Sequence, residues 1–139
     1  MIDLSRFVSA QEGTFAQALA ELKAGNKTGH WIWWVFPQLA GLGQSATAQR
    51  YGLAGLAEAT AYAAHPVLGP RLKQAVDAML PHGDPAAVLG ELDATKLRSC
   101  LTLFERVDGR QFAAVALAAL FGGKRDPMTL SLLDAADAV

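Results

Sequence analysis

The chain contains QFAAVALAALF at residues 111–121, and this uncharged run predicts a central helix that the rest of the protein covers on most sides. Alanine is the best helix former and permits close packing of helices, and it accounts for 27 of the 139 residues. No segment shows the sustained alternation of apolar and polar residues that indicates a strand. We therefore predict an all-α fold of about seven or eight helices, in a single compact domain over residues 1–139.

Other helices are indicated on the N-terminal side of this run. Ser9 and Glu12 have the spacing of a capping box, which predicts a helix that begins there, and Gly25 can end that helix in a left-handed conformation. Residues 45–64 also predict a helix, interrupted or bent near its two glycines. The run WIWWVF at residues 31–36 fits a buried strand or a buried helix, and we assign a short helix because no partner strand is evident.

Prolines mark the starts of further helices, because the amide that proline lacks would have no intrahelical partner in the first turn. They are Pro66, Pro85 and Pro127. The helix after the first of them is expected to bury Leu68, Leu72, Val76 and Met79. Asp84 and Asp126 precede the other two prolines and are predicted N-caps, and Asp93 is predicted to cap a helix over residues 94–107.

The composition excludes several classes of function. A net charge of -1 and the lack of a basic stripe argue against a nucleic-acid partner. The longest uncharged stretch, residues 28–49, contains a proline, glycines and several polar residues, so we expect no membrane span. A single cysteine and a start without a secretory signal pattern favour a soluble cytoplasmic protein.

Residues 27–38, KTGHWIWWVFPQ, are the densest in candidate functional groups, with all three tryptophans beside Lys27, His30 and Gln38. Adjacent tryptophans point in different directions, so one can fill the core while another, with Trp31 as our candidate, stacks on a base or sugar ring of a ligand. The alternative is that all three tryptophans pack in the core.

Two later segments supply further candidates. His65 lies before a predicted helix and Arg71 on its second turn, where they can bind an anion or move a proton; a capping or exposed histidine is the alternative. Lys96 and Ser99 lie on neighbouring positions of a helix, as an amine base with a hydroxyl nucleophile or as two phosphate donors. The alternative is an ordinary Asp93–Lys96 ion pair on a solvated surface.

Catalysis, if present, would use Glu58 or Asp93 as general base and His30 or His65 as proton shuttle. The three histidines share no ligand spacing with one another or with carboxylates, so we predict no metal site and no cofactor. The glycines at residues 41–43 precede a helix but lack the rest of a phosphate-binding motif, which favours an ordinary turn.

HWIW at residues 30–33 and FPQ at residues 36–38 are the most specific part of a pattern that extends over nearly the whole chain. The pattern also includes residues 3–7, 20–27, 41–43, 65–72, 96–97 and 102–104, with Gln11, Tyr51, Glu58, Ala59, Asp93, Ser99, Asp126 and Thr129. In this pattern the chain resembles a bacterial family of small, mostly helical proteins, classed as a domain of unknown function and often mislabelled "calpastatin". The chain departs from it at Gly29, where the family has serine, so a ligand contact through that hydroxyl would be absent here.

The resemblance implies an all-α fold and no established activity. It does not imply protease inhibition, because calpastatin-like inhibitors are long disordered chains. Our leading hypothesis is a site for a small anionic ligand, such as a nucleotide, sugar phosphate or ADP-ribose-like compound, which the chain binds and can also hydrolyse. Its expected binding residues are Lys27, Trp31, Gln38, Arg71, Lys96 and Ser99. The competing hypothesis is a protein-interaction module without chemistry, in which these polar residues are structural. Both leave the oligomeric state and the question of enzymatic activity open.

Overall fold

The computed structural model describes residues 2–107 and 109–137, and within them the chain forms ten α-helices, one short 3-10 helix and no strand. The helices are α1 (Ser5–Gln11), α2 (Phe15–Ala24), α3 (Ile32–Val35), α4 (Ala46–Tyr51), α5 (Leu56–Ala64), α6 (Leu68–Met79), η1 (Leu80–His82), α7 (Pro85–Leu89), α8 (Glu91–Glu105), α9 (Gln111–Phe121) and α10 (Pro127–Asp137). The all-α prediction is therefore confirmed. The predicted helix number is close, because seven of the ten helices have at least seven residues.

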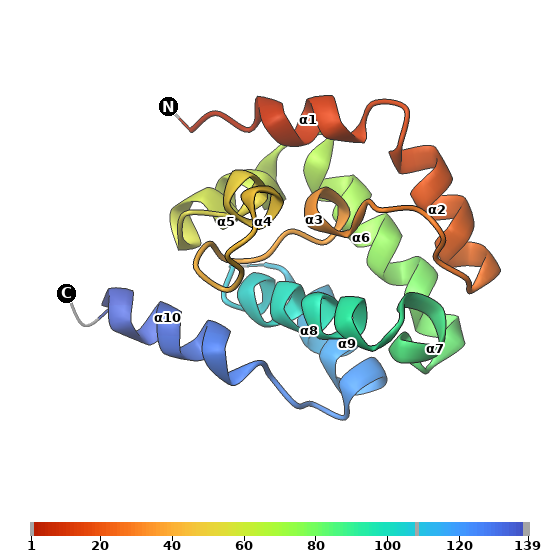
Figure 1. Cartoon of the computed structure of the whole chain (residues 1–139). Coiled ribbons are helices and arrows are strands. Elements are labelled where there is room, and N and C mark those ends of the chain that lie inside the picture. Colours follow the sequence, from red (N-terminus) through yellow and green to blue (C-terminus); the bar gives the residue numbers. More distant parts are fainter. Residues whose placement is uncertain (1, 108, 138–139) are drawn as a thin grey trace.

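Helix α8 is the centre of the packing (Figure 1). It contacts α5, α7, α9 and α10, while α6 packs against α2, α5 and α9 and carries the core to the N-terminal helices. The buried side chains of α8 include Leu97, Leu101 and Phe104, and α6 contributes Leu68, Leu72, Val76 and Met79, as its spacing predicts. One continuous hydrophobic core thus connects the two ends of the chain.

Helix α9 differs from its prediction. Ala113, Ala116, Leu117 and Leu120 are buried on one face. The opposite face is open, and Val115 is 58% exposed there. The expectation that this helix is covered on most sides is therefore wrong. Its alanine-rich composition predicts the helix correctly but not its environment, because alanine is accepted on both buried and exposed faces.

Most of the predicted helix ends and caps are confirmed. Gly25 ends α2 with φ 77°, and the side chains of Asp84 and Asp126 accept hydrogen bonds from the amides of Ala86 and Thr129 at 3.1 and 3.0 Å. Residues 45–64 form two helices, α4 and α5, separated at the two glycines. Residues 32–35 form the short helix assigned to them.

Two predicted caps are wrong. Ser9 lies inside α1, and α2 begins only at Phe15, so Ser9 and Glu12 do not form a capping box. Asp93 does not cap a helix either, because α8 already begins at Glu91 after Gly90. The Asp93 carboxylate is thereby free for the lysine contacts described below. The described residues contain no helix that is both long and apolar enough to cross a membrane.

Candidate functional site

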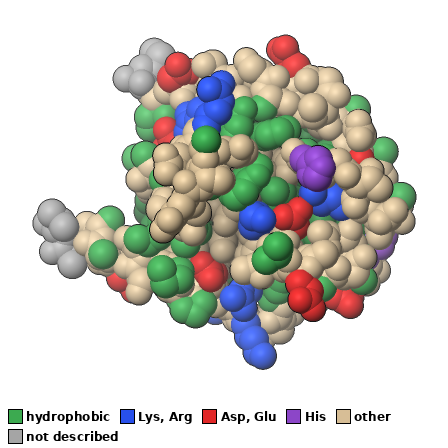
Figure 2. All heavy atoms as spheres, viewed as in Figure 1, with side chains coloured by type: hydrophobic (Ala, Val, Ile, Leu, Met, Phe, Trp, Pro, Cys, Tyr) green, Lys and Arg blue, Asp and Glu red, His purple; other side chains and the backbone are tan. Residues whose placement is uncertain are grey.

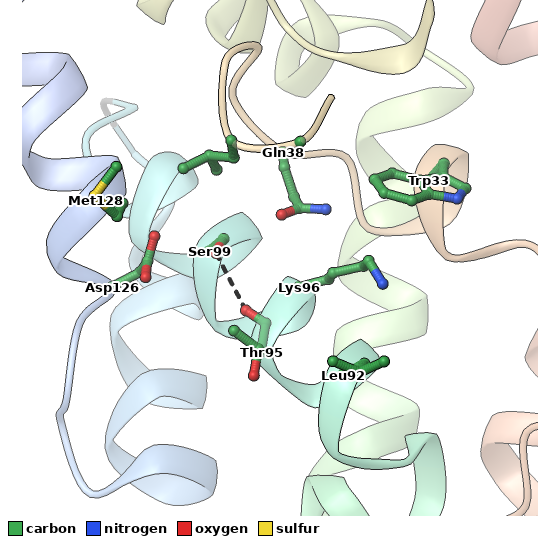
Figure 3. Close-up of a pocket in the computed structure, with 10 residues that line it drawn as sticks. Trp33, Gln38, Leu92, Thr95, Lys96, Ser99, Asp126 and Met128 are labelled. Atoms are coloured by element: carbon green, nitrogen blue, oxygen red, sulfur yellow. Dashed lines mark hydrogen bonds between the residues drawn. The ribbon is translucent and has the colours of Figure 1, made fainter. Parts of the chain in front are cut away.

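A cavity of about 320 Å³ opens between α3, the segment after it, α8 and the start of α10 (Figure 3). Its lining combines large apolar side chains with a few polar ones, which is the usual make-up of a small-molecule site. The lining residues are Trp33, Gln38, Leu42, Gly43, Leu92, Thr95, Lys96, Ser99, Asp126 and Met128. The cavity thus brings three of the predicted binding residues together, namely Gln38, Lys96 and Ser99.

One of the charged side chains at the cavity, that of Lys96, belongs to a cluster of two lysines around one carboxylate. Asp93 Oδ2 lies 2.8 Å from the ammonium of Lys27, and Asp93 Oδ1 lies 3.0 Å from the ammonium of Lys96. The side chain of Lys27 is only 8% exposed, whereas that of Lys96 is 24% exposed and reaches the cavity. The cluster therefore carries one positive charge in excess. Figure 2 shows acidic and basic side chains adjoining near the middle of this face, bordered by hydrophobic ones.

The same cluster sets the protonation state of Asp93. Burial acts to raise the pKa of this carboxyl, but the hydrogen bonds from Lys27 and Lys96 outweigh burial and hold the pKa below its ordinary value. Asp93 is therefore a carboxylate at neutral pH with both oxygens occupied. A carboxylate in that state is a weak base, and its role in this geometry is to hold the two ammonium groups.

Each lysine of the cluster also lies over a tryptophan ring. The ammonium of Lys27 is 5.0 Å from the centroid of Trp31, and that of Lys96 is 4.9 Å from the centroid of Trp33, in the range of cation–π attraction. Trp31 is 2% exposed and its indole NH donates to Glu21, so it fills the core. Trp33 is half-buried and lines the cavity, so the tryptophan at the cleft is Trp33 and not the candidate Trp31.

Gln38 and Ser99 supply neutral polar groups to the cavity. The backbone of Gln38 is fixed because its carbonyl accepts a hydrogen bond from Leu53 at 2.8 Å, while its side-chain amide makes no hydrogen bond to any residue in the described ranges. The hydroxyl of Ser99 donates to the carbonyl of Thr95 at 3.1 Å, so its oxygen keeps its capacity to accept. Figure 3 shows the Gln38 amide facing Ser99 across the cavity.

The other predicted site residues lie away from the cavity. Glu58 pairs with Arg6 at 2.8 Å, Arg71 donates to Gln11 at 3.3 Å, and His65 Nδ1 accepts from the amides that begin α6. His65 is therefore the capping histidine of the alternative interpretation. His30 is exposed, and its side chain has no hydrogen bond within residues 2–107 and 109–137. No group of metal-ligating residues occurs in the described part of the chain.

Sequence reasoning assigned Asp126 to a helix cap and missed its place in the cavity. Its Oδ2 does accept from the amide and hydroxyl of Thr129, at 3.0 and 2.5 Å, as a cap should. The carboxylate nevertheless also lines the cavity, together with Met128 on the same helix. The sequence shows only that the residue before α10 is an aspartate and not a neutral capping residue. That observation does not indicate that its side chain lines a cavity.

Comparison with known proteins gives a family but no activity. The chain is 44% identical to the conserved hypothetical protein Rv1873 from Mycobacterium tuberculosis, with 95% of this chain and 96% of that chain covered and a TM-score of 0.92. No curated protein matches the chain. Residues 1–133 match the family described as "Protein of unknown function (DUF1810)". The match spans almost the whole chain, and the protein therefore belongs to the DUF1810 family.

Proposed function

We propose that the cavity beside α8 binds a small anionic ligand, such as a nucleotide, a sugar phosphate or an ADP-ribose-like compound. The observation that carries the proposal is the excess positive charge of the Lys27–Asp93–Lys96 cluster. Lys27 and Lys96 share the single carboxylate of Asp93, so the cluster keeps a net positive charge, and Lys96 is the member of it that lines the cavity. An anion there gains a charge-assisted hydrogen bond, which is stronger than a neutral one.

The size of the cavity limits the ligand. A volume of about 320 Å³ is at the small end of the range of ligand pockets, roughly 300–1,000 Å³. This volume favours a ligand of the size of a sugar phosphate or a nucleoside monophosphate. An ADP-ribose-like compound would place one half of the molecule outside, along either Leu92 or Met128, which line the cavity and are 81% and 59% exposed.

The geometry supports binding more than hydrolysis. Hydrolysis by the residues considered from the sequence needs a general base at the ligand, and none of His30, Glu58, His65 and Asp93 is among the residues that line the cavity. Ser99 is no better placed as a nucleophile, because its hydroxyl donates to a backbone carbonyl and not to an amine. A binding protein is the conclusion that these contacts favour.

Lys96→Met tests this proposal, because methionine keeps the apolar contact with Trp33 and removes the charge. We expect Lys96→Met to bind AMP and ribose 5-phosphate at least about tenfold more weakly than the native chain, since one charge-assisted hydrogen bond is lost. Isothermal titration calorimetry at fixed ionic strength measures the effect. Lys73→Met is the matched control, because Lys73 forms an exposed ion pair with Asp77 on α6, away from the cavity, and its loss should leave binding unchanged.

A native chain that binds neither compound would overturn the anion site, and so would equal affinities of the native and Lys96→Met proteins. Either result would favour the protein-interaction module. That second candidate is supported by Leu92 and Met128, two large apolar side chains that line the cavity and are left exposed. It is also supported by Lys27, Trp31 and Asp93, whose polar groups are satisfied by other residues of the chain.

A further inference from the structure

The carboxylate of Asp126 uses one of its oxygens for the fold and leaves the other available. Oδ2 accepts both hydrogen bonds from Thr129 and caps α10. Oδ1 accepts no hydrogen bond from the described residues, and its nearest cation, the guanidinium of Arg98, lies 3.7 Å away, which is beyond hydrogen-bonding distance. A helix cap needs one acceptor oxygen, and the second forms a long ion pair with Arg98 without a hydrogen bond.

Asp126 is nevertheless a buried residue, with 6% exposure, and it lines the cavity. Buried carboxylate oxygens are normally hydrogen-bonded. In the part of the chain that the structure describes, Nε of Arg98 is the only fully buried side-chain nitrogen or oxygen without a hydrogen bond. Oδ1 of Asp126 also lacks a hydrogen bond there, so it is not fully buried. Oδ1 therefore reaches the space of the cavity, where it can accept a hydrogen bond from a bound molecule.

The neighbours of Asp126 indicate which kind of donor it would accept. The guanidinium of Arg98 lies beside Oδ1 and makes this part of the cavity unfavourable for a cationic donor. A neutral hydroxyl can donate to Oδ1 without that repulsion. Ser99 lies between Asp126 and Lys96 at the cavity and offers a further neutral contact to a hydroxyl-bearing ligand (Figure 3).

Lys96 and Asp126 are held at different points along α8. The backbone amide of Asp126 donates a hydrogen bond to the hydroxyl of Thr102 at 3.0 Å, which places Asp126 beside that residue. Thr102 lies six residues after Lys96 on α8. Six residues correspond to about 9 Å along the axis of a helix. A separation of this order suits a phosphorylated sugar, which has an anion at one end and hydroxyls at the other, better than inorganic phosphate.

We propose that Asp126 is a ligand-binding residue that accepts hydrogen bonds from sugar hydroxyls, and that the ligand of the cavity is therefore a sugar phosphate, free or as part of a nucleotide. This inference rests on the anion site proposed for Lys96 and specifies what binds there. Lys96 holds the phosphate, and Asp126 distinguishes a hydroxylated ligand from one without hydroxyls.

Asp126→Asn provides the test, because asparagine caps helices as well as aspartate does but has only one acceptor oxygen. With that oxygen on Thr129, an NH₂ donor replaces Oδ1 in the cavity. The native chain, Asp126→Asn and Lys96→Met are titrated calorimetrically with inorganic phosphate, phosphoethanolamine, ribose 5-phosphate and AMP. A thermal melt of each variant shows whether α10 is still capped.

We expect the native chain to bind ribose 5-phosphate at least about tenfold more tightly than phosphate or phosphoethanolamine, because one hydrogen bond to a charged group is added. Asp126→Asn should lose this preference and keep its affinity for phosphate, whereas Lys96→Met should lose affinity for both. Tighter binding of AMP than of ribose 5-phosphate assigns the sugar phosphate to a nucleotide, and the reverse assigns it to a free sugar.

Two results would overturn the role of Asp126 and leave the anion site intact. They are an Asp126→Asn protein that keeps the native preference for ribose 5-phosphate, and a native chain that binds phosphate or phosphoethanolamine as tightly as ribose 5-phosphate. A native chain that binds none of the four compounds would overturn the anion site itself, and the role of Asp126 with it.

Discussion

Replacing Asp93 by alanine is expected to lower the free energy of unfolding by about 3 kcal/mol, because an uncompensated ammonium group is then left in the interior. The side chain of Lys27 is 8% exposed, and its ammonium lies 2.8 Å from Asp93. Without the carboxylate it keeps the carbonyl of Gly29 and the ring of Trp31, but neither carries a negative charge. The loss therefore exceeds that of a surface ion pair, which contributes about 0–1 kcal/mol.

A double variant separates the cost of the unpaired charge from the value of the pair. Replacing a buried ion pair by apolar residues is often close to neutral, so Asp93→Ala combined with Lys27→Met should recover most of the lost stability. Urea denaturation of the single and double variants measures the coupling between the two sites. Asp77→Ala, which breaks the exposed pair with Lys73, is the control and should change stability by less than about 1 kcal/mol.

If Asp93→Ala lowers the free energy of unfolding no more than Asp77→Ala does, the cluster does not hold a buried charge. The excess positive charge assigned to the cluster would then lose its basis, because that assignment depends on a charged Lys27 beside Asp93. The stability of one variant thus bears directly on the proposed function.

The parts of the fold that the sequence predicted are those that depend on nearby residues. The cap of Asp84 and the left-handed end at Gly25 involve atoms within a few positions along the chain, and both are present. The predicted capping box of Ser9 and Glu12 is wrong although its spacing is correct, because α1 begins earlier, at Ser5, and Ser9 lies inside it. Spacing alone does not show which of two overlapping helix starts is used.

The candidate site was predictable only where its residues share a segment. Lys96 and Ser99 are three positions apart on one helix, so their common location follows from helical geometry. Arg71 was expected beside them, but it packs over Phe15 and contacts α1 instead, which depends on how α6 crosses α2. Helix crossing is set by the shapes of many side chains in contact, and local patterns do not specify it.

Asp126 shows a different limit of sequence reasoning. Its role as a cap was predicted and is present, and a single role was sufficient to explain the residue. Its second oxygen reaches the cavity because α10 packs against α8, which brings residue 126 beside Arg98 and Thr102. A polar residue with a known local function can therefore have a second function that only tertiary structure reveals.

Glu21→Ala is expected to lower the free energy of unfolding by about 2 kcal/mol, because one carboxylate oxygen holds the whole segment that leads into α3. Oε1 of Glu21 accepts hydrogen bonds from the amides of Thr28 and Gly29 and from the indole of Trp31, at 2.8, 2.9 and 2.9 Å. Hydrogen bonds to charged groups contribute about 1.5–3 kcal/mol each, and partial exposure of Glu21 reduces their sum. Glu12→Ala, which removes an exposed glutamate outside the helices, is the control.

The same contacts make the contribution of Glu21 depend on pH. Burial acts to raise the pKa of Glu21, but the hydrogen bonds from Gly29, Trp31, Thr28 and Gln17 outweigh it and hold the pKa far below the ordinary value of 4.5. A carboxyl whose pKa is lowered in the folded state stabilises the fold above its unfolded pKa, and this stabilisation is lost as the pH falls from about 4.5 towards the folded value.

Glu21→Gln isolates the charge, because glutamine keeps an acceptor oxygen and cannot ionise. We expect the native chain to be more stable than Glu21→Gln at pH 7 and the difference to shrink as the pH is lowered below 4.5, since the carboxyl then becomes protonated in the unfolded chain, which favours unfolding of the native sequence. Urea denaturation followed by tryptophan fluorescence at pH 7, 5 and 3 measures the difference. A difference that does not change with pH would show that Glu21 acts through the geometry of its hydrogen bonds and not through its charge.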